Sequence, residues 1–149
     1  MFAAEDVVFM NPQSEFHNPA DTLLDNIESI NDSNSRLPHF CDASLKDLRN
    51  HDLRTGSKLY EYALRIYLAD SAPLLNRITS GIEAGDTDQV RQASHSLKSN
   101  SLLVGALRVG NLAGIIEDSA RLGEVPTVST AHQLQALVEM ANKEIATRL

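Results

Sequence analysis

From about residue 44 onward, apolar side chains recur every three or four positions, and no stretch of useful length alternates apolar with polar residues. Recurrence at this interval places apolar side chains on one face of an α-helix, whereas strict alternation would indicate a half-buried strand. The chain has no Trp and only 5% aromatic residues, so Leu, Ile, Val and Ala must fill most of a core. These features favour closely packed helices over a β-sandwich.

Turn and capping residues divide this region into predicted helices, of which the first two differ in length. A short helix is expected over 44–53, with Ser44 as its cap, and a long helical run from about 58 to 84. Pro73 lies inside the long run, where it should either bend the helix or let a new one start at Ser71.

Three further helices are expected in the second half of the chain. Gly85 suits the C-cap of the long helix, and Asp86 with Gln89 three residues later resembles a capping box. The expected ranges are about 87–103, 106–122 and 130–149, the last with a cap at Thr130. Four substantial helices joined by short loops pack most economically as an antiparallel up-and-down bundle. The predicted fold is therefore all-α, a four-helix bundle with a short additional N-terminal helix.

The N-terminal part of the chain has a different composition. It is rich in Asn, Ser, Asp and Pro, so we expect residues 1–40 to form a mostly disordered tail or linker and residues 41–149 the bundle. A short amphipathic turn over 22–30 is an alternative for part of this tail. The first 35 residues hold seven acidic side chains and no Lys or Arg, so this stretch accounts for the whole net charge of −7.

Charge, hydropathy and cysteine usage limit the partners and the compartment. An acidic tail on an otherwise neutral chain disfavours nucleic acid and anionic membranes as partners. No stretch approaches the roughly 18 apolar residues that span a bilayer, and the N-terminus lacks the features of a secretory signal. Cys41 is the only cysteine, so no internal disulfide can form. We therefore expect a cytoplasmic protein.

His95 lies in the helix expected over 87–103, and its position around that helix can be counted at about 100° per residue. The predicted buried stripe covers roughly 80° and consists of Val90, Ala93, Leu97, Ser101 and Val104. His95 lies roughly 170° from the centre of this stripe, so its imidazole should point into water. An exposed His is usually plain solvated surface, so exposure alone assigns no function.

Four residues share the face of His95. Arg91 lies one turn before it, Lys98 and Ser99 lie one turn after it, and Leu102 lies two turns after it. Two cations and an exposed leucine can form a docking patch for an acidic partner.

An exposed imidazole has a chemistry that suits these neighbours. The neutral ring is a nucleophile near pH 7 and can accept a phosphoryl group from an incoming donor. Phosphoryl transfer passes through a loose, anionic transition state, so it needs in-line access and nearby positive charge. Lys98 can supply that charge with Arg91 in reach, and Ser99 is small enough to leave the ring open.

The sequence shows no means of making or hydrolysing a phosphate bond. It contains no Gly-rich phosphate loop and no G-x-x-x-x-G-K-[ST] motif. Cys41 has no organised base that would make it a thiol nucleophile. No set of His and carboxylate residues has metal-binding spacing, and His39 with Cys41, two residues apart, makes a poor zinc site. We therefore expect a phosphocarrier that is not an enzyme and has no metal or cofactor of its own.

The run SHSLKSNSLLVGA at 94–106 resembles the A-H-x-L-K-G and G-A signature of histidine-containing phosphotransfer (HPt) domains. Three other segments are similar to the same family. IYLADSAPLL resembles its aromatic-Leu-x-Asp segment, IEAGD its G-D turn, and LAGIIEDSARLG the helix that packs alongside. The resemblance covers roughly residues 44–149 and is most specific across 82–122.

The resemblance implies that His95 takes a phosphoryl group from the aspartate of one receiver domain and passes it to another response regulator. Two-component phosphorelays work in this way, so receiver domains and a hybrid sensor histidine kinase are the implied partners. The receiver would supply the acidic pocket and Mg²⁺. Glu117 matches a position that hydrogen-bonds the inner imidazole nitrogen, and Arg121 matches one that is often basic. A plain surface role remains an equal alternative for both. Gly105 matches a turn that favours a positive φ.

Two departures from the family leave other hypotheses open. Ser94 and Ser99 stand where Ala and Gly are usual, and Ser99 can either bond the phosphoryl group or crowd it. This departure and the exposed Leu102 leave room for a non-transferring helical module that binds and regulates a receiver domain or kinase. A third hypothesis is the dimerising helix pair of a sensor kinase, but that element usually shows H-E-x-x-x-P, which the residues after His95 lack. We expect a monomer.

Overall fold

A computed structural model gives the structure of the 149-residue chain and describes residues 34–149. These residues form one compact unit that contains five α-helices and, over this range, no strand. The helices are α4 (Asp42–Thr55), α5 (Leu59–Ala84), α6 (Thr87–Val104), α7 (Leu107–Arg121) and α8 (Val128–Ala146). The all-α prediction is confirmed, whereas the amphipathic turn expected over 22–30 lies outside the described residues.

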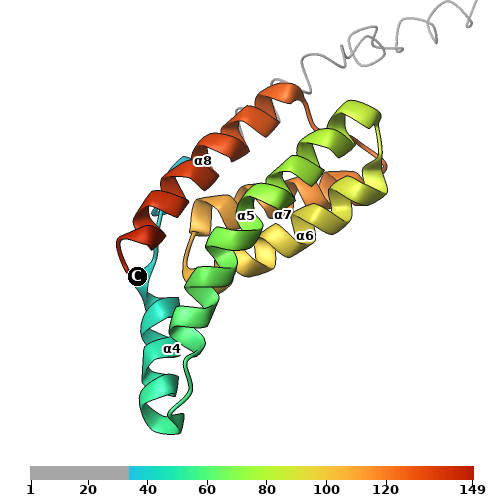
Figure 1. Ribbon diagram of the computed structural model, residues 1–149. Coiled ribbons are helices and arrows are strands. Elements are labelled where there is room, and N and C mark those ends of the chain that lie inside the picture. The colour runs from blue at the N-terminus through green and yellow to red at the C-terminus, as the bar shows by residue number, and fades with distance from the viewer. Residues whose placement is uncertain (1–33) are drawn as a thin grey trace, which may run out of the picture. The chain divides into compact units, whose positions relative to one another are not determined.

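Helices α5 to α8 lie side by side as the predicted up-and-down bundle (Figure 1). Short loops make consecutive helices antiparallel, and each helix packs against its two neighbours. Across the diagonal, the backbones of α6 and α8 stay apart within residues 34–149. The short helix α4 packs against α5 and α6 and is the additional N-terminal helix that the sequence predicts.

Helix α6 begins and ends at the residues that the sequence indicates. Gly85 and Gly105 occupy the C-cap positions of α5 and α6 with φ of 67° and 84°, a region that a residue without Cβ adopts at little cost. The Asp86 carboxylate accepts a hydrogen bond from the backbone N–H of Gln89. In a capping box the Gln89 side chain would bond the backbone N–H of Asp86. Here the Gln89 side chain donates instead to the carbonyl oxygen of Arg77.

The start of α4 and the continuity of α5 differ from the prediction. Helix α4 begins at Asp42, so Ser44 lies inside it and does not cap it. Pro73 does not divide α5, which is continuous from Leu59 to Ala84. Pro73 and Ala69, whose carbonyl loses its usual donor, are both exposed, and water can solvate that carbonyl.

Helix α8 also begins earlier than predicted. Its cap is Thr127, whose hydroxyl oxygen accepts a hydrogen bond from the backbone N–H of Thr130. Thr130 is therefore inside the helix and buried. Thr127, Ser129 and Thr130 stand close together at the start of α8, and each of them satisfies the chemical requirement for a cap.

The core contains the stripe that was counted on α6. All five members of that stripe, from Val90 to Val104, are fully buried. The largest other fully buried apolar side chains are Tyr67, Leu64, Ile78, Leu112, Ile116, Leu134 and Ile145. The solvent side of α6 therefore faces away from a packed interior, and the orientation of His95 is determined by this burial.

The compact unit begins at Asn34, earlier than the predicted boundary between residues 40 and 41. The residues from 34 to 40 pack with the bundle. Arg108 Nε donates a hydrogen bond to the carbonyl oxygen of Leu37 at 2.8 Å, and Cys41 N–H donates to the carbonyl oxygen of Gly105 at 2.8 Å. Hydrogen bonds of this kind produce no apolar periodicity, so the sequence pattern does not indicate that the compact unit starts at Asn34.

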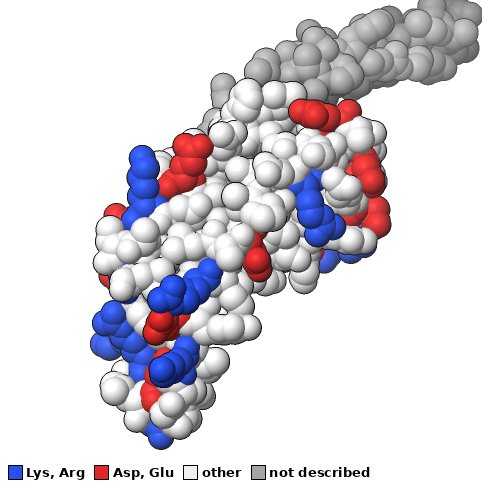
Figure 2. Space-filling model, viewed as in Figure 1, with Lys and Arg blue, Asp and Glu red and all other residues white. Residues whose placement is uncertain are grey.

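The surface of this unit carries both signs of charge. On the face seen in Figure 2, Lys and Arg gather toward the α4 end with acidic side chains among them, and neutral side chains occupy the middle. Within residues 34–149, every helix falls short of the length and apolar character needed to cross a membrane.

A glycine pair tests the packing of the α6–α7 turn. A Cβ at Gly105 would collide with the backbone carbonyl of Cys41, whereas a Cβ at Gly85 would meet no atom within 4 Å. Gly85→Ala should lower the free energy of unfolding by about 1 to 2 kcal/mol, the cost of positive φ alone. Gly105→Ala adds overpacking and should lower it by about 3 kcal/mol or more. Urea denaturation of both variants measures the difference, and equal losses would contradict the contact with Cys41.

Candidate functional site

His95 lies on the solvent side of α6. Its side chain is 58% exposed, whereas Ser94 and Leu97 on the same helix are fully buried. The exposure that the helical count predicts is therefore confirmed.

Beneath His95 lies Glu117 of α7, whose side chain is only 1% exposed. The Nδ1 atom of His95 lies 2.8 Å from Oε1 of Glu117, within hydrogen-bond distance. The inner nitrogen of the ring is thus held by the neighbouring helix, as the resemblance implies. Glu117 is buried, so the alternative of a plain surface role for this residue is wrong.

Two cations share the same carboxylate. Lys98 Nζ lies 2.6 Å from Oε2 of Glu117, and Arg121 Nη2 donates to Oε1 at 2.7 Å. A buried carboxylate without partners would be strongly destabilising. These contacts explain why an acid is tolerated in the otherwise apolar interface between α6 and α7.

Burial and these contacts act on the pKa of Glu117 in opposite directions. Burial raises the pKa, while hydrogen bonds from Lys98 and His95 and the charges of Lys98 and Arg121 lower it. The contacts outweigh burial, so the pKa of Glu117 lies below its ordinary value. Glu117 is therefore a carboxylate at neutral pH.

The ionised Glu117 determines which nitrogen of His95 is reactive. A carboxylate only accepts hydrogen bonds, so Nδ1 must carry the proton of the neutral ring. The lone pair then resides on Nε2, on the side of the ring away from Glu117. The site combines a nucleophilic nitrogen in solvent with the positive charges of Lys98 and Arg121 beside it.

The other predicted residues lie on the same side of α6 but outside the Glu117 cluster. Arg91 Nη2 donates to Asp88 at 2.8 Å, one turn toward the start of the helix. Ser99 Oγ donates to the carbonyl oxygen of His95 at 3.1 Å, so its hydroxyl is directed along its own helix. Leu102 is 44% exposed. The functions assigned to these three residues stay predictions.

Two glycines of α7 contribute to the site and were not identified from the sequence. A Cβ on Gly110 would lie 2.7 Å from Leu102 Cδ2, and one on Gly114 would lie 3.2 Å from Lys98 Cδ. Residues four apart share a helix face, so their spacing in LRVGNLAG was the available signal. Their lack of side chains lets α7 approach α6 and brings Glu117 within reach of His95.

Residues 34–149 include no group of three or more His, Cys, Asp or Glu side chains that could hold a metal ion. His39 and Cys41, the pair considered as a zinc site, lie at the start of the compact unit, where Cys41 precedes α4.

Comparisons with known proteins agree with this arrangement. A family model described as the Hpt domain matches residues 63–144, which include the whole Glu117 cluster. The fold is similar to the crystal structure of histidine-containing phosphotransfer protein B (HptB) from Pseudomonas aeruginosa PAO1, with a TM-score of 0.66. The two chains are 24% identical over 74% of this chain and 94% of that chain, a likeness that shows the fold. No curated protein matches the sequence.

The lowered pKa of Glu117 predicts how acid affects stability. A depressed pKa stabilises the fold above the ordinary value of 4.5, and this stabilisation is lost as the pH falls through the folded-state pKa. Glu117→Gln keeps an acceptor for His95 and removes the charge, so it should lower the free energy of unfolding by about 1 kcal/mol at pH 7. The difference in free energy of unfolding between wild type and Glu117→Gln, measured by urea titration, should become smaller below pH 4.5. Asp118→Asn controls for net charge, and a difference that is constant with pH would contradict the assignment.

Proposed function

This chain belongs to the Hpt domain family, and we propose that it is a phosphorelay carrier whose phosphoryl-accepting atom is Nε2 of His95. Family membership gives a role in histidine phosphotransfer within two-component signalling. The finer proposal is that a receiver-domain aspartate donates the phosphoryl group and that a second response regulator receives it.

One observation supports this proposal most strongly. The hydrogen bond between Nδ1 of His95 and the buried Glu117 leaves Nε2 unprotonated and turned toward solvent. A phosphorylated aspartate of another protein can approach this nitrogen without any movement of the bundle. A histidine placed only for solubility would need no buried carboxylate behind it.

The transfer can be written with its charges balanced. The Nε2 lone pair attacks phosphorus, the N–P bond forms, and the P–O bond to the receiver aspartate breaks, which leaves a carboxylate on the receiver. The proton on Nδ1 stays in place, so the phosphorylated ring carries a positive charge. Glu117 stabilises that charge, as the aspartate of a catalytic triad stabilises an imidazolium. Attack by the next receiver's carboxylate reverses these steps and regenerates the neutral ring.

Positive charge near the ring supports the passage of an anionic phosphoryl group. Lys98 and Arg121 together carry two positive charges against the single charge of Glu117, so the cluster keeps a net positive charge. This charge favours the phosphoryl group in transit. Mg²⁺ would be held by the receiver domain, and the carrier needs no cofactor of its own.

The two other hypotheses receive less support. The non-transferring module rests partly on Ser99, whose hydroxyl donates to the carbonyl oxygen of His95 within α6. The dimerising helix pair of a sensor kinase completes its four-helix bundle with a second chain, whereas α5 to α8 form the bundle within one chain. We therefore propose a monomeric carrier that serves a hybrid sensor histidine kinase and a response regulator.

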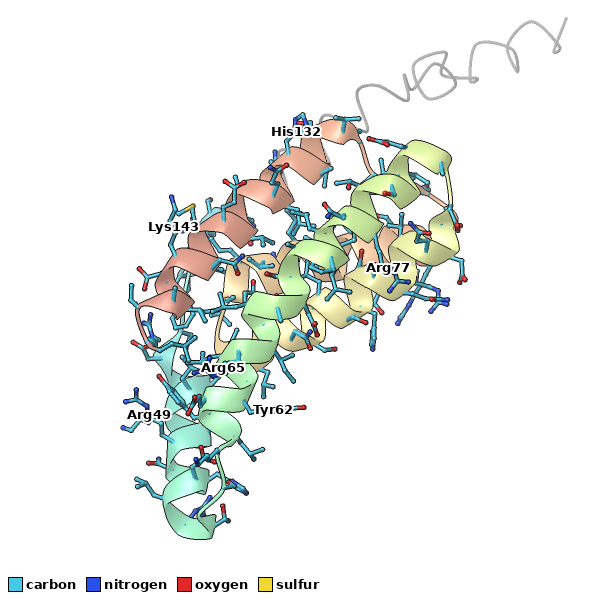
Figure 3. The ribbon with its side chains drawn as sticks, viewed as in Figure 1. Arg49, Tyr62, Arg65, Arg77, His132 and Lys143 are labelled. Carbon is cyan, nitrogen blue, oxygen red and sulfur yellow. The ribbon has the colours of Figure 1, made fainter. Side chains whose placement is uncertain are left out.

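Replacement of His95 tests this function. The protein is incubated with a receiver domain phosphorylated with ³²P, and acid-labile, base-stable label on the carrier is measured. His95→Gln should abolish this label. The matched control is His132→Gln, because His132 is another exposed histidine, near the start of α8 (Figure 3), and this variant should take up label at the wild-type rate. Uptake of label by His95→Gln at the wild-type rate would contradict the proposal.

A further inference from the structure

Residues 34–41, here called the strap, cross from the start of the compact unit to α4 and lie against α7. Arg108 of α7 holds them by two carbonyl oxygens, since Nε donates to Leu37 at 2.8 Å and Nη2 donates to Ser35 at 3.3 Å. Asn111, one turn further along α7, donates to the side-chain oxygen of Asn34 at 3.2 Å, and Asn34 is buried.

The other end of the strap is joined to the turn between α6 and α7. Cys41 N–H donates to the carbonyl oxygen of Gly105 at 2.8 Å, and the two backbones are too close for any Cβ on Gly105. The strap is thus held at both ends, and its path is set by backbone and side-chain hydrogen bonds.

Between the strap, α6 and α7 lies an open groove of about 420 Å³. Leu37 of the strap lines one side, Lys98 and Leu102 of α6 line the other, and Gly110, Gly114 and Ile115 belong to α7. Leu37, Leu102 and Ile115 give the groove apolar walls, so it can admit apolar side chains of another protein.

The groove shares Lys98 with the phosphoryl-accepting site. Lys98 lines it and also contacts Glu117, which in turn holds His95. A protein that reaches Nε2 of His95 will therefore also cover the groove, whereas a small molecule need not.

Charge around the groove favours an acidic partner. Arg108 donates to carbonyl oxygens, which do not neutralise its guanidinium. With Lys98 and Arg121 it gives three positive charges on or beside the groove, against two negative charges from Glu117 and from Asp118, which lines the groove. A receiver domain carries its phosphorylated aspartate in an acidic pocket, so this charge is complementary to it.

We propose that the strap, held by Arg108, forms one wall of the receiver-docking groove beside His95 and that Leu37 on this wall selects which receiver is accepted. The proposal rests on the proposed function. Specificity arises because a receiver must present apolar side chains that fit between Leu37 and Leu102, while the chemistry at His95 is common to all receivers.

Two kinds of donor separate docking from chemistry. A phosphorylated receiver has to dock, whereas phosphoramidate is a small molecule that transfers its phosphoryl group to an imidazole and releases ammonia. Leu37→Glu should lower kcat/KM with the preferred receiver about tenfold relative to the rate of labelling by phosphoramidate, because it places a negative charge against an acidic partner. The matched control is Leu53→Glu, since Leu53 is 85% exposed on α4 and lies outside the groove. It should leave the ratio unchanged.

Variants of Arg108 test whether its hydrogen bonds to the carbonyl oxygens of the strap position this wall of the groove. Arg108→Lys keeps the charge but lacks the planar fork that bonds two carbonyl oxygens. Arg108→Lys should therefore lower the ratio of receiver kcat/KM to phosphoramidate labelling about as much as Arg108→Ala does. An effect of charge alone would leave Arg108→Lys near wild type. Circular dichroism melts of these variants show whether the bundle stays folded, and phosphoramidate labelling shows whether His95 stays reactive.

The outcomes distinguish this inference from the function on which it rests. Wild-type transfer rates from the receiver in Leu37→Glu and Arg108→Ala would overturn the inference and leave the phosphorelay role intact. A wild-type protein that phosphoramidate labels at His95 but that no receiver labels would contradict the phosphorelay role and the inference with it. Concentration-dependent dimerisation that Leu37→Glu abolishes would show a second copy in the groove, and would also overturn the inference.

Discussion

The buried carboxylate of Glu117 is the interaction on which the rest of the site depends. One carboxylate holds the inner nitrogen of His95, the ammonium of Lys98 and the guanidinium of Arg121. Its burial makes each contact stronger than it would be in water, and its three partners offset the unfavourable desolvation of the charge. The same contacts fix the proton of His95 on Nδ1, and in the transfer we propose they would supply an anion that balances the positive ring.

The spacing between α6 and α7 makes this contact possible. Gly110 and Gly114 place no side chain between the two helices, so the carboxylate of Glu117 reaches His95 without distortion of either helix. Leu102 and Lys98 of α6 lie over these glycines and form one side of the groove between α6, α7 and the strap. The close approach of α7 to α6 thus orients His95, and the groove beside it is where we propose that the donor protein docks.

The residues that follow helical periodicity were predictable from the sequence, and those held by other means were not. The buried stripe of α6 and the exposure of His95 follow from 3.6 residues per turn and are confirmed. The resemblance, and not the pattern, pointed to the bond between Glu117 and His95. The sequence pattern does not indicate the burial of Glu117, because an acid on a helix is usually solvated. The sequence does not indicate the strap, because hydrogen bonds to Arg108 and Gly105 leave no apolar pattern.

The tautomer of His95 is the most direct test of this account, since the reactivity of Nε2 depends on where the ring proton resides. Long-range ¹H–¹⁵N correlation spectra of the free protein, at a pH where the ring is neutral, distinguish a protonated nitrogen from an unprotonated one. We expect a protonated Nδ1 and an unprotonated Nε2 for His95. A ring that carries its proton on Nε2 would contradict the account, because the solvent-facing nitrogen would then have no lone pair to offer.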